Sequence, residues 1–298
     1  MQEGYKSGFV AILGRPNVGK STLLNRLVGQ KVAIMSDKPQ TTRNKIQAVI
    51  TRPDAQIVLL DTPGVHKPKH KLGSFMLSEV QRALEEVDAV LLVLDATEKI
   101  GAGDRYVVEQ LSKINTPVFL LLNKVDLLKK EKLPDIIRQA GELGDFTEIL
   151  PLAAKTGLNV ELLVDKIVEK LPYGPQYYPE DMVTDQPERL IIGEMVREKA
   201  LHLTRDEVPH AIAVEVEEVT KRPNKDLVYV QAVIYVERDS QKGIIVGKNG
   251  SMLKKIGRLA REDIEKLLGN RIYLDLWVKV KDDWRNRDGC LKSLGYDE

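Results

Sequence analysis

The feature that most constrains the fold is a glycine-rich loop near the start of the chain, Gly14-x-x-x-x-Gly19-Lys20-Ser21. An apolar run at residues 9–13, typical of a buried strand, precedes it, and residues 20–28 after it have helical spacing. Glycines let backbone N–H groups surround phosphate oxygens, and the start of a helix adds partial positive charge. A simple strand-to-helix turn is the alternative, but the flanking elements favour a P-loop that binds a nucleoside triphosphate.

Short apolar runs alternate with amphipathic stretches from residue 9 to about residue 171. Runs of this kind, buried on both faces and separated by helices, predict an α/β fold with a mostly parallel, doubly wound sheet. The ligand of such a sheet lies at the carboxyl ends of its strands. Pro53 and Asp54 form a tight turn, which predicts a hairpin that adds one antiparallel edge strand. The expected buried strands are residues 9–13, 55–61, 88–95, 117–123 and 148–154.

A stretch rich in proline and glycine, residues 171–190, ends this alternation. Beyond it we expect a helix, two strands, a second glycine turn, another helix and a last strand whose apolar residues alternate with polar or aromatic ones. This order predicts a small α+β domain with helices on one side of its sheet. The predicted divisions are residues 1–174, a linker at 175–188, and residues 189–298 including a C-terminal tail.

Composition limits the classes of protein to consider. With 43% hydrophobic and 30% charged residues the chain is expected to be globular, and its net charge of +1 leaves any attraction to nucleic acid to a local patch. The single Cys290 cannot form an internal disulfide and fits a reducing compartment. No apolar run reaches 18 residues and no signal peptide is evident, so secretion and membrane spanning are not expected.

Two further motifs follow predicted strands and indicate which nucleotide is bound. Asp61-Thr62-Pro63-Gly64 offers a carboxylate that reaches Mg²⁺ and a glycine N–H that meets the γ-phosphate, although Pro-Gly is also ordinary turn chemistry. Asn123-Lys124-Val125-Asp126 offers the Asp126 carboxylate to the N1–H and 2-amino group of guanine. Adenine has neither donor there, and a buried acceptor left unpaired discriminates by a factor on the order of 10⁴. The motifs therefore predict GTP rather than ATP, with a charged strand end as the alternative for the second.

These motifs resemble those of the translation-factor-related GTPases. The resemblance implies that Thr42, favoured over Thr41, meets Mg²⁺ from the first switch segment, and that the Ala154 N–H contacts the guanine O6, since Ala153 replaces the usual serine. The expected catalytic residues are Lys20, Asn17, Thr42 and Gly64, and the expected metal ligands are Ser21, Thr42 and Asp61. The full set of expected nucleotide and metal contacts is Asn17, Val18, Gly19, Lys20, Ser21, Thr22, Thr42, Asp61, Gly64, Asn123, Lys124, Asp126, Ala153, Ala154 and Lys155.

Val65 stands where Ras-type enzymes place a glutamine that orients the attacking water. A hydrophobic side chain cannot do this, so we expect slow intrinsic turnover. By analogy with related GTPases, Asn17 is expected to help bind K⁺, which would complete the site. His66 and His70 lie in the second switch loop without an orienting carboxylate, and we interpret them as solvated loop residues rather than as a base or metal ligands.

The second glycine loop, Gly247-Lys248-Asn249-Gly250, lies between two helical pieces of the α+β domain. Residues 240–261 carry six basic side chains and no acidic one, a patch of a single sign. The loop resembles the GxxG signature of a type II KH domain, which implies a groove for about four single-stranded nucleotides; a solvated helix-turn-helix corner is the alternative. Further candidates for RNA contacts are Trp277, Trp284, Arg285 and Arg287. For Trp277 a packed aromatic is the alternative. The residues expected at RNA are Ile244, Gly247, Lys248, Asn249, Gly250, Lys254, Lys255 and Arg258.

Taken together, the chain resembles the Era-like family within the TrmE-Era-EngA-like GTPases. The resemblance implies binding of GTP or GDP with Mg²⁺, binding near the 3′ end of 16S ribosomal RNA, a role in 30S subunit assembly, and a cytoplasmic protein, expected as a monomer, that associates peripherally with the membrane. A membrane-associated signalling GTPase with a protein-binding C-terminal domain is the alternative. A tRNA-modification GTPase or one with two GTPase domains is disfavoured by the single P-loop and the intact GxxG.

Overall fold

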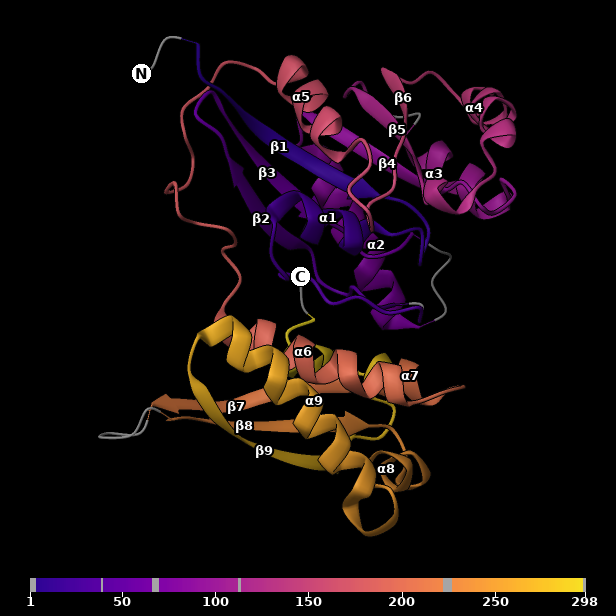
Figure 1. The fold of residues 1–298 in the computed structure, drawn as a ribbon. Helices are drawn as coiled ribbons and strands as arrows, with labels where there is room; N and C mark the ends of the chain where they lie inside the picture. The colour runs from indigo at the N-terminus through magenta and orange to yellow at the C-terminus, as the bar shows by residue number, and fades with distance from the viewer. Residues whose placement is uncertain (1–3, 39, 66–69, 112–113, 222–226, 297–298) are drawn as a thin grey trace. The chain divides into compact units, whose positions relative to one another are not determined.

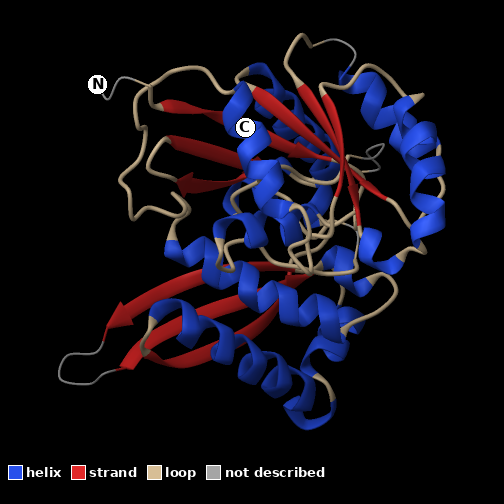
Figure 2. Cartoon of the chain, turned by 45° about the horizontal axis from the view of Figure 1, so that its top comes forward, coloured by secondary structure: helices blue, strands red, loops and turns tan. Residues whose placement is uncertain are grey.

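The computed structural model describes residues 4–38, 40–65, 70–111, 114–221 and 227–296. The chain divides into two compact units. The first, here called the G unit, comprises Met1–Ala33, Thr42–Pro68 and Met76–Asp185. The second, here called the KH unit, comprises Ile34–Thr41, Lys69–Phe75 and Gln186–Glu298. Each unit has a sheet of its own (Figures 1 and 2).

The G unit is built on a six-stranded sheet with the order β2-β3-β1-β4-β5-β6. β3 and β4 lie parallel to β1 on either side, β5 and β6 continue in parallel, and β2 pairs antiparallel with β3. Arg52 N–H donates to the Ala55 carbonyl at 2.8 Å to close the predicted hairpin. The predicted doubly wound sheet with one antiparallel edge is therefore confirmed. The strands are β1 (Lys6–Leu13), β2 (Ile46–Thr51), β3 (Ala55–Asp61), β4 (Ala89–Asp95), β5 (Val118–Asn123) and β6 (Glu148–Pro151).

Helices cover both faces of this sheet, which is why β3 and β4 are buried along their whole length. One core cluster packs Leu23 of α1 and Leu163 of α5 against the strands, and another uses Val80 of α2, Val107 of α3 and Ala140 of α4. Glycines in the left-handed conformation begin and end α1. The helices are α1 (Lys20–Val28), α2 (Lys71–Glu85), α3 (Ala102–Leu111), α4 (Leu133–Gly141) and α5 (Val160–Lys170), with short 3₁₀ turns at Val125–Leu127 and Lys130–Lys132.

The KH unit has a three-stranded sheet in the order β7-β8-β9, with β7 antiparallel and β9 parallel to β8. Ile192 of α6 and Ile256 and Ile264 of α9 pack on the same core as Val230 of β8, and Figure 1 shows both helices against one face of the sheet. The predicted α+β fold is confirmed. Its elements are α6 (Glu188–Leu203), α7 (Val208–Ala211), β7 (Ala213–Lys221), β8 (Leu227–Val236), α8 (Asp239–Val246), the 3₁₀ turn Lys248–Gly250, α9 (Ser251–Leu268), β9 (Arg271–Val280), the 3₁₀ turn Trp284–Asn286 and α10 (Asp288–Ser293).

Trp284 is part of the interior of the KH unit. It is 0% exposed, donates from Nε1 to the Ala211 carbonyl at 2.8 Å and stacks on Tyr296. A Trp without accessible faces cannot stack on bases, so its suggested RNA contact is wrong. Arg285 pairs with Glu237 at 2.6 Å and Arg287 with Asp282 at 2.9 Å, so carboxylates already bind both guanidinium groups.

The described residues of the segment just before Thr42, 34–38, 40 and 41, belong to the KH unit and include hydrogen-bond partners of α6. The buried carboxylate of Glu198 accepts the Met35 N–H at 2.9 Å. The Arg197 guanidinium is 0% exposed, pairs with Glu194, and donates to the backbone carbonyls of residues 40 and 41. Buried charges require such partners. Glu198 and Arg197 of α6 therefore hold the segment at Met35 and at residues 40 and 41.

Candidate functional site

The first glycine loop joins β1 to α1 as predicted, and its glycines adopt conformations that other residues avoid. Gly14 has φ +149° and a side chain there would collide with the Val93 carbonyl at 2.4 Å. Gly19 has φ +102° and lies against the Asn123 amide. Inside the loop the Lys20 ammonium donates to the carbonyls of Gly14 and Arg15 at 3.1 and 3.0 Å. Lys20 is thereby placed where it would meet β- and γ-phosphate oxygens.

Ser21, Thr42 and Asp61 converge from three different segments. The Ser21 hydroxyl donates to Asp61 Oδ2 at 2.8 Å and lies 3.0 Å from the Thr42 hydroxyl, which is 3.4 Å from the same carboxylate oxygen. Asp61 Oδ1 is buried and has no hydrogen-bond partner among the described residues. Two hydroxyls beside a carboxylate with an unsatisfied buried oxygen are the hard oxygen ligands that Mg²⁺ prefers, so these residues fit that ion.

Burial shifts the pKa values of the two charged groups in this cluster toward their neutral forms. It raises the pKa of Asp61 to about 6, against the lowering effect of the Lys20 charge and of the Ser21 and Thr42 hydroxyls. It lowers the pKa of Lys20 to about 8, against the raising effect of Asp61. A divalent cation would stabilise the ionised carboxylate and so offset the desolvation that raises its pKa.

The two switch threonines have different partners. Thr41 donates to the Lys38 carbonyl at 2.6 Å, whereas Thr42 is the one at Ser21 and Asp61. This geometry supports the preference for Thr42 over Thr41. Gly64 lies against the P-loop, where a side chain would meet Pro16 at 2.8 Å, and Val65 is 4% exposed with its N–H on the Gly14 carbonyl. The buried isopropyl group of Val65 offers nothing to orient a water.

Asn123 connects the loops around the expected base position. Its Nδ2 donates to the Val18 carbonyl at 2.8 Å and its Oδ1 accepts the Ala154 N–H at 2.9 Å, all in a buried environment. The Ala154 N–H is thus donated to Asn123, and its expected contact with the guanine O6 stays a prediction. Lys124, with φ +66°, donates to the Asn17 carbonyl at 2.9 Å.

The remaining predicted residues frame the same site. Asp126 is exposed at the carboxyl end of β5, open to the donors of a base. Val18 and Ala153 are buried and contribute packing and backbone, while Lys155 is exposed and its carbonyl accepts from Arg26 at 2.6 Å. Thr22 follows Ser21 in the first turn of α1. Arg26, which sequence reasoning missed, tethers the 153–155 loop, and no motif signalled it.

The interpretation of His66 and His70 as solvated loop residues stays a prediction. His66 lies outside the described residues, and His70 precedes α2 at its edge. No group of three or more His, Cys, Asp or Glu suited to a metal occurs in the part of the chain that the structure describes.

The second glycine loop is a compact turn between α8 and α9. Gly247, Asn249 and Gly250 have φ values of +70°, +50° and +75°, so the backbone reverses within four residues. Lys248 and Asn249 are exposed at its tip, and Ile244 is 48% exposed on α8. Free backbone approach and an exposed ammonium at one place suit a phosphodiester.

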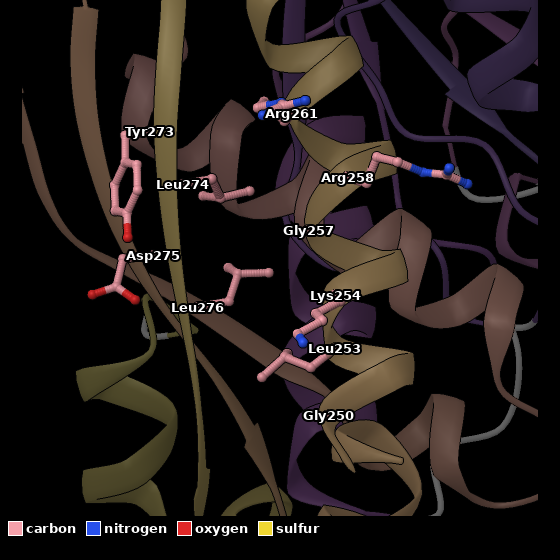
Figure 3. Close-up of a pocket in the computed structure, with 10 residues that line it drawn as sticks. All are labelled: Gly250, Leu253, Lys254, Gly257, Arg258, Arg261, Tyr273, Leu274, Asp275 and Leu276. Carbon is pink, nitrogen blue, oxygen red and sulfur yellow. The ribbon is translucent and has the colours of Figure 1, made fainter. Parts of the chain in front are cut away.

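A groove of about 550 Å³ runs from this loop between α9 and β9. Figure 3 shows Leu253 and Lys254 on the helix facing Leu274 and Leu276 on the strand. The helix side of the groove carries Lys254, Arg258 and Arg261, and the strand side turns Leu274 and Leu276 toward it. Such an arrangement seats the backbone on one side and the bases on the other. The residues that line it are Gly250, Leu253, Lys254, Gly257, Arg258, Arg261, Tyr273, Leu274, Asp275 and Leu276.

Three of the predicted RNA residues, Gly250, Lys254 and Arg258, line this groove, and Gly247 and Lys248 belong to the loop at its end. Lys255 is exposed on α9 but does not line it. The apolar wall of β9 was missed as part of the groove. The alternation of this strand and the helix before it were both predicted from the sequence, but nothing in the sequence showed that the two elements form a groove between them.

None of the helices within the described ranges is long and apolar enough to cross a membrane.

Comparison with known proteins gives a consistent result over both units. Residues 9–124 match the family described as 50S ribosome-binding GTPase, and residues 207–285 match the KH domain family. GTPase Era of Alkaliphilus metalliredigens (strain QYMF) is 57% identical over 293 residues, which cover 98% of this chain and 99% of that protein.

Two solved structures are similar over essentially the whole chain. A variant of Aquifex aeolicus Era bound to GDP·AlF4⁻ has a TM-score of 0.95 at 42% identity, covering 98% of this chain and 100% of the other. Era in complex with MgGDPNP and nucleotides 1506–1542 of 16S ribosomal RNA has a TM-score of 0.93 at 44% identity, covering 99% and 100%.

Proposed function

Because the chain belongs to the Era family of GTPases, we propose that it hydrolyses GTP and, under the control of the bound nucleotide, binds single-stranded RNA near the 3′ end of 16S ribosomal RNA during 30S subunit assembly. The observation that carries the proposal is the coexistence in one chain of a complete P-loop site and a basic-walled groove that starts at a GxxG turn. The signalling alternative does not account for that groove. We place the protein in the cytoplasm and propose peripheral contact with the membrane.

The nucleotide site acts mainly by position and charge. Lys20 and the N–H groups of the P-loop would hold the phosphates, and Ser21, Thr42 and Asp61 would hold Mg²⁺. The ion, when bound, neutralises charge on the β- and γ-phosphates. Gly64 brings its backbone to the γ-phosphate side of the P-loop, since no side chain would fit against Pro16.

Turnover is expected to depend on a group that supplements the site. Val65 is buried and apolar, so it cannot align the attacking water, and Asn17 is the candidate to help bind K⁺ beside the phosphates. Hydrolysis measured in KCl and in NaCl at equal ionic strength should be faster in KCl for the unmodified protein, and Asn17→Ala should lose the difference. Equal rates in both salts for both proteins would remove K⁺ from the proposal.

Base choice is tested at Asp126. Its exposed carboxylate would accept two hydrogens from guanine, and Asp126→Asn turns one acceptor into a donor that suits xanthine. The variant should bind xanthosine triphosphate better than GTP in competition experiments. Retained preference for GTP would contradict the assignment of this residue.

RNA binding is tested at the tip of the GxxG turn. Lys248→Asp with Asn249→Asp adds negative charge at two exposed positions, and an RNA of the 1506–1542 sequence should then bind at least tenfold more weakly in a filter assay. The control, Lys129→Asp with Gln139→Asp, makes the same charge change at exposed positions of the G unit. Equal loss in the two double variants would reduce the effect to net charge and reject the groove.

Gly247→Asp and Gly250→Asp provide a second test of the same turn. A side chain at Gly247 would collide with Met252 at 2.7 Å, whereas at Gly250 it meets nothing within 4 Å and disturbs only the φ of +75°. Both should weaken RNA binding, and unchanged affinity in the double variant would reject the RNA assignment.

A further inference from the structure

The sheet of the KH unit has a second face, opposite to the one that α6 and α9 cover. Figure 3 shows Leu274 and Leu276 pointing toward α9, whereas Tyr273 and Asp275 point away from it. Trp277, the next residue with the same parity on β9, is 55% exposed, and Tyr273 is 57% exposed. Two large aromatic side chains therefore stand on this open face with more than half of their surface in solvent.

The aromatic side chains of the open face are held in fixed orientations. Tyr229 of β8 stacks on Tyr273 with ring centroids 5.9 Å apart and planes within 11°. Asp275 accepts both the Tyr229 hydroxyl at 3.2 Å and the Trp277 Nε1 at 3.1 Å. A carboxylate that orients two rings preorganises the surface, which lowers the entropy lost when a ligand stacks on it.

The charge of this face is opposite to that of the RNA groove. Glu215, Glu217 and Glu218 come from β7, and Asp275 adds a fourth carboxylate from β9. The carboxylate of Glu215 lies beside the hydroxyl of Tyr235. Burial and this carboxylate raise the pKa of Tyr235 to about 12. The register pairs Glu218 with Gln231, and Glu217 accepts from Gln231 at 2.9 Å, so the carboxylates of both lie along the middle strand.

Three basic residues of the described chain accompany these four carboxylates. Arg271 is exposed on the same side of β9 as Tyr273, and the other two, both lysines, are engaged. Lys279 pairs with Glu217 at 3.2 Å, and the Lys281 ammonium lies 5.0 Å from the centroid of the Tyr235 ring. The carboxylates outnumber the basic residues by one, so the face is net acidic, whereas Lys254, Arg258 and Arg261 on α9 make the groove basic. A phosphodiester backbone would be repelled from the open face, and a cation would be attracted to it.

We propose that this open sheet face, formed by Tyr229, Tyr273, Asp275, Trp277, Glu217 and Glu218, docks a basic protein segment. Arginine or lysine side chains of the partner would lie over the exposed rings of Trp277 and Tyr273 while the carboxylates pair with their charge. The Lys281 ammonium over Tyr235 already shows this type of contact within the chain. Tyr273 and Asp275 also border the groove, so the groove and the open face would recognise RNA and protein at adjoining surfaces of one strand.

The proposal is tested with a fluorescein-labelled peptide of alternating arginine and glycine and with intact protein at 0.15 M salt. Trp277→Ala and the double variant Glu217→Gln with Glu218→Gln should each weaken peptide binding, followed by fluorescence anisotropy, at least fivefold. The control, Glu131→Gln with Glu142→Gln, removes the same charge at exposed positions of the G unit and should change it less than twofold. Circular dichroism checks that each variant is folded.

The same variants are titrated with the 1506–1542 RNA, which separates this site from the groove. Binding of RNA should be unchanged within twofold by Trp277→Ala. If Trp277→Ala weakens RNA and leaves the peptide unaffected, the open face binds RNA and the proposal is overturned. Equal weakening of the peptide by the control pair overturns it as well, because binding would then follow net charge alone.

Discussion

Asn123 provides the sharpest test of how the nucleotide site is assembled. Its side chain is 2% exposed and makes two buried hydrogen bonds, one to the Val18 carbonyl of the P-loop and one from the Ala154 N–H of the 153–155 loop. Asn123→Ala leaves both partners unsatisfied. At about 1–3 kcal/mol for each stranded buried group, the two together cost about 2–6 kcal/mol.

Most of this cost should appear in nucleotide binding. In the free variant the two loops can separate and let water reach the Val18 carbonyl and the Ala154 N–H, but a bound nucleotide brings the loops together again. The lower limit of about 2 kcal/mol corresponds to an increase in Kd of about 30-fold, since about 1.4 kcal/mol is a factor of ten. We therefore expect a fluorescent GDP analogue to bind Asn123→Ala at least 30-fold more weakly.

The assay is a fluorescence titration of folded protein, with thermal unfolding followed in parallel. Asn115→Ala removes the same side chain at an exposed position of the G unit and should leave the Kd unchanged within twofold. An increase below tenfold for Asn123→Ala, in a protein that unfolds at the normal temperature, would refute the reasoning that these two bonds hold the site together.

Four other predictions concern Asp61, the RNA groove and the core of the KH unit. Because burial raises the pKa of Asp61 to about 6, protonation of this carboxylate should compete with Mg²⁺ binding. The affinity of the GDP complex for Mg²⁺ should therefore fall as the pH drops through about 6. Asp61→Asn should remove this pH dependence in Mg²⁺ titrations at pH 5.5 and 7.5. Without nucleotide, the stability of the protein should change with pH in the opposite direction. The pKa of Asp61 is higher in the folded protein than its unfolded value of about 3.9, so the apo protein should lose stability as the pH rises from about 4 to about 6. Urea unfolding would detect this loss, and a flat profile over that range would contradict it. Gly257→Leu should fill the groove and weaken RNA binding at least tenfold while GTP hydrolysis stays within twofold, so normal RNA affinity would place the RNA elsewhere. Trp284→Phe leaves the Ala211 carbonyl without its donor and should lower the free energy of unfolding of the KH unit, measured in urea, by about 1–3 kcal/mol. Trp277→Phe at an exposed site should change this free energy by less than about 0.5 kcal/mol. Similar values for the two variants would refute the burial argument.

Local patterns predicted the fold because the decisive information is local. The spacing from Gly14 to Ser21 requires a turn between a strand and a helix, and alternation along residues 272–280 identifies β9 with one buried and one open side. Residues that end parallel strands meet at one edge of the sheet, which is why Asp61 and Asn123 could be assigned to one site from sequence alone.

What the sequence could not predict depends on partners far along the chain. Trp284 resembles a stacking residue in sequence, but the Ala211 carbonyl, 73 residues earlier, holds it inside. Nothing local to Ala154 shows that its amide donates to Asn123, 31 residues away. Residues 34–41 carry no signal for packing on α6.

The contacts between α6 and the segment before Thr42 have a consequence for the design of fragments of the protein. A fragment that began at residue 189 would contain α6 without its partners from residues 34–41. The buried guanidinium of Arg197 would lose two carbonyl acceptors, and the carboxylate of Glu198 would lose the Met35 amide. Such a fragment would be expected to rearrange around its exposed charges, so its RNA affinity would report on a different molecule. Point variants in the full-length chain are the sounder way to assign activities to the two units.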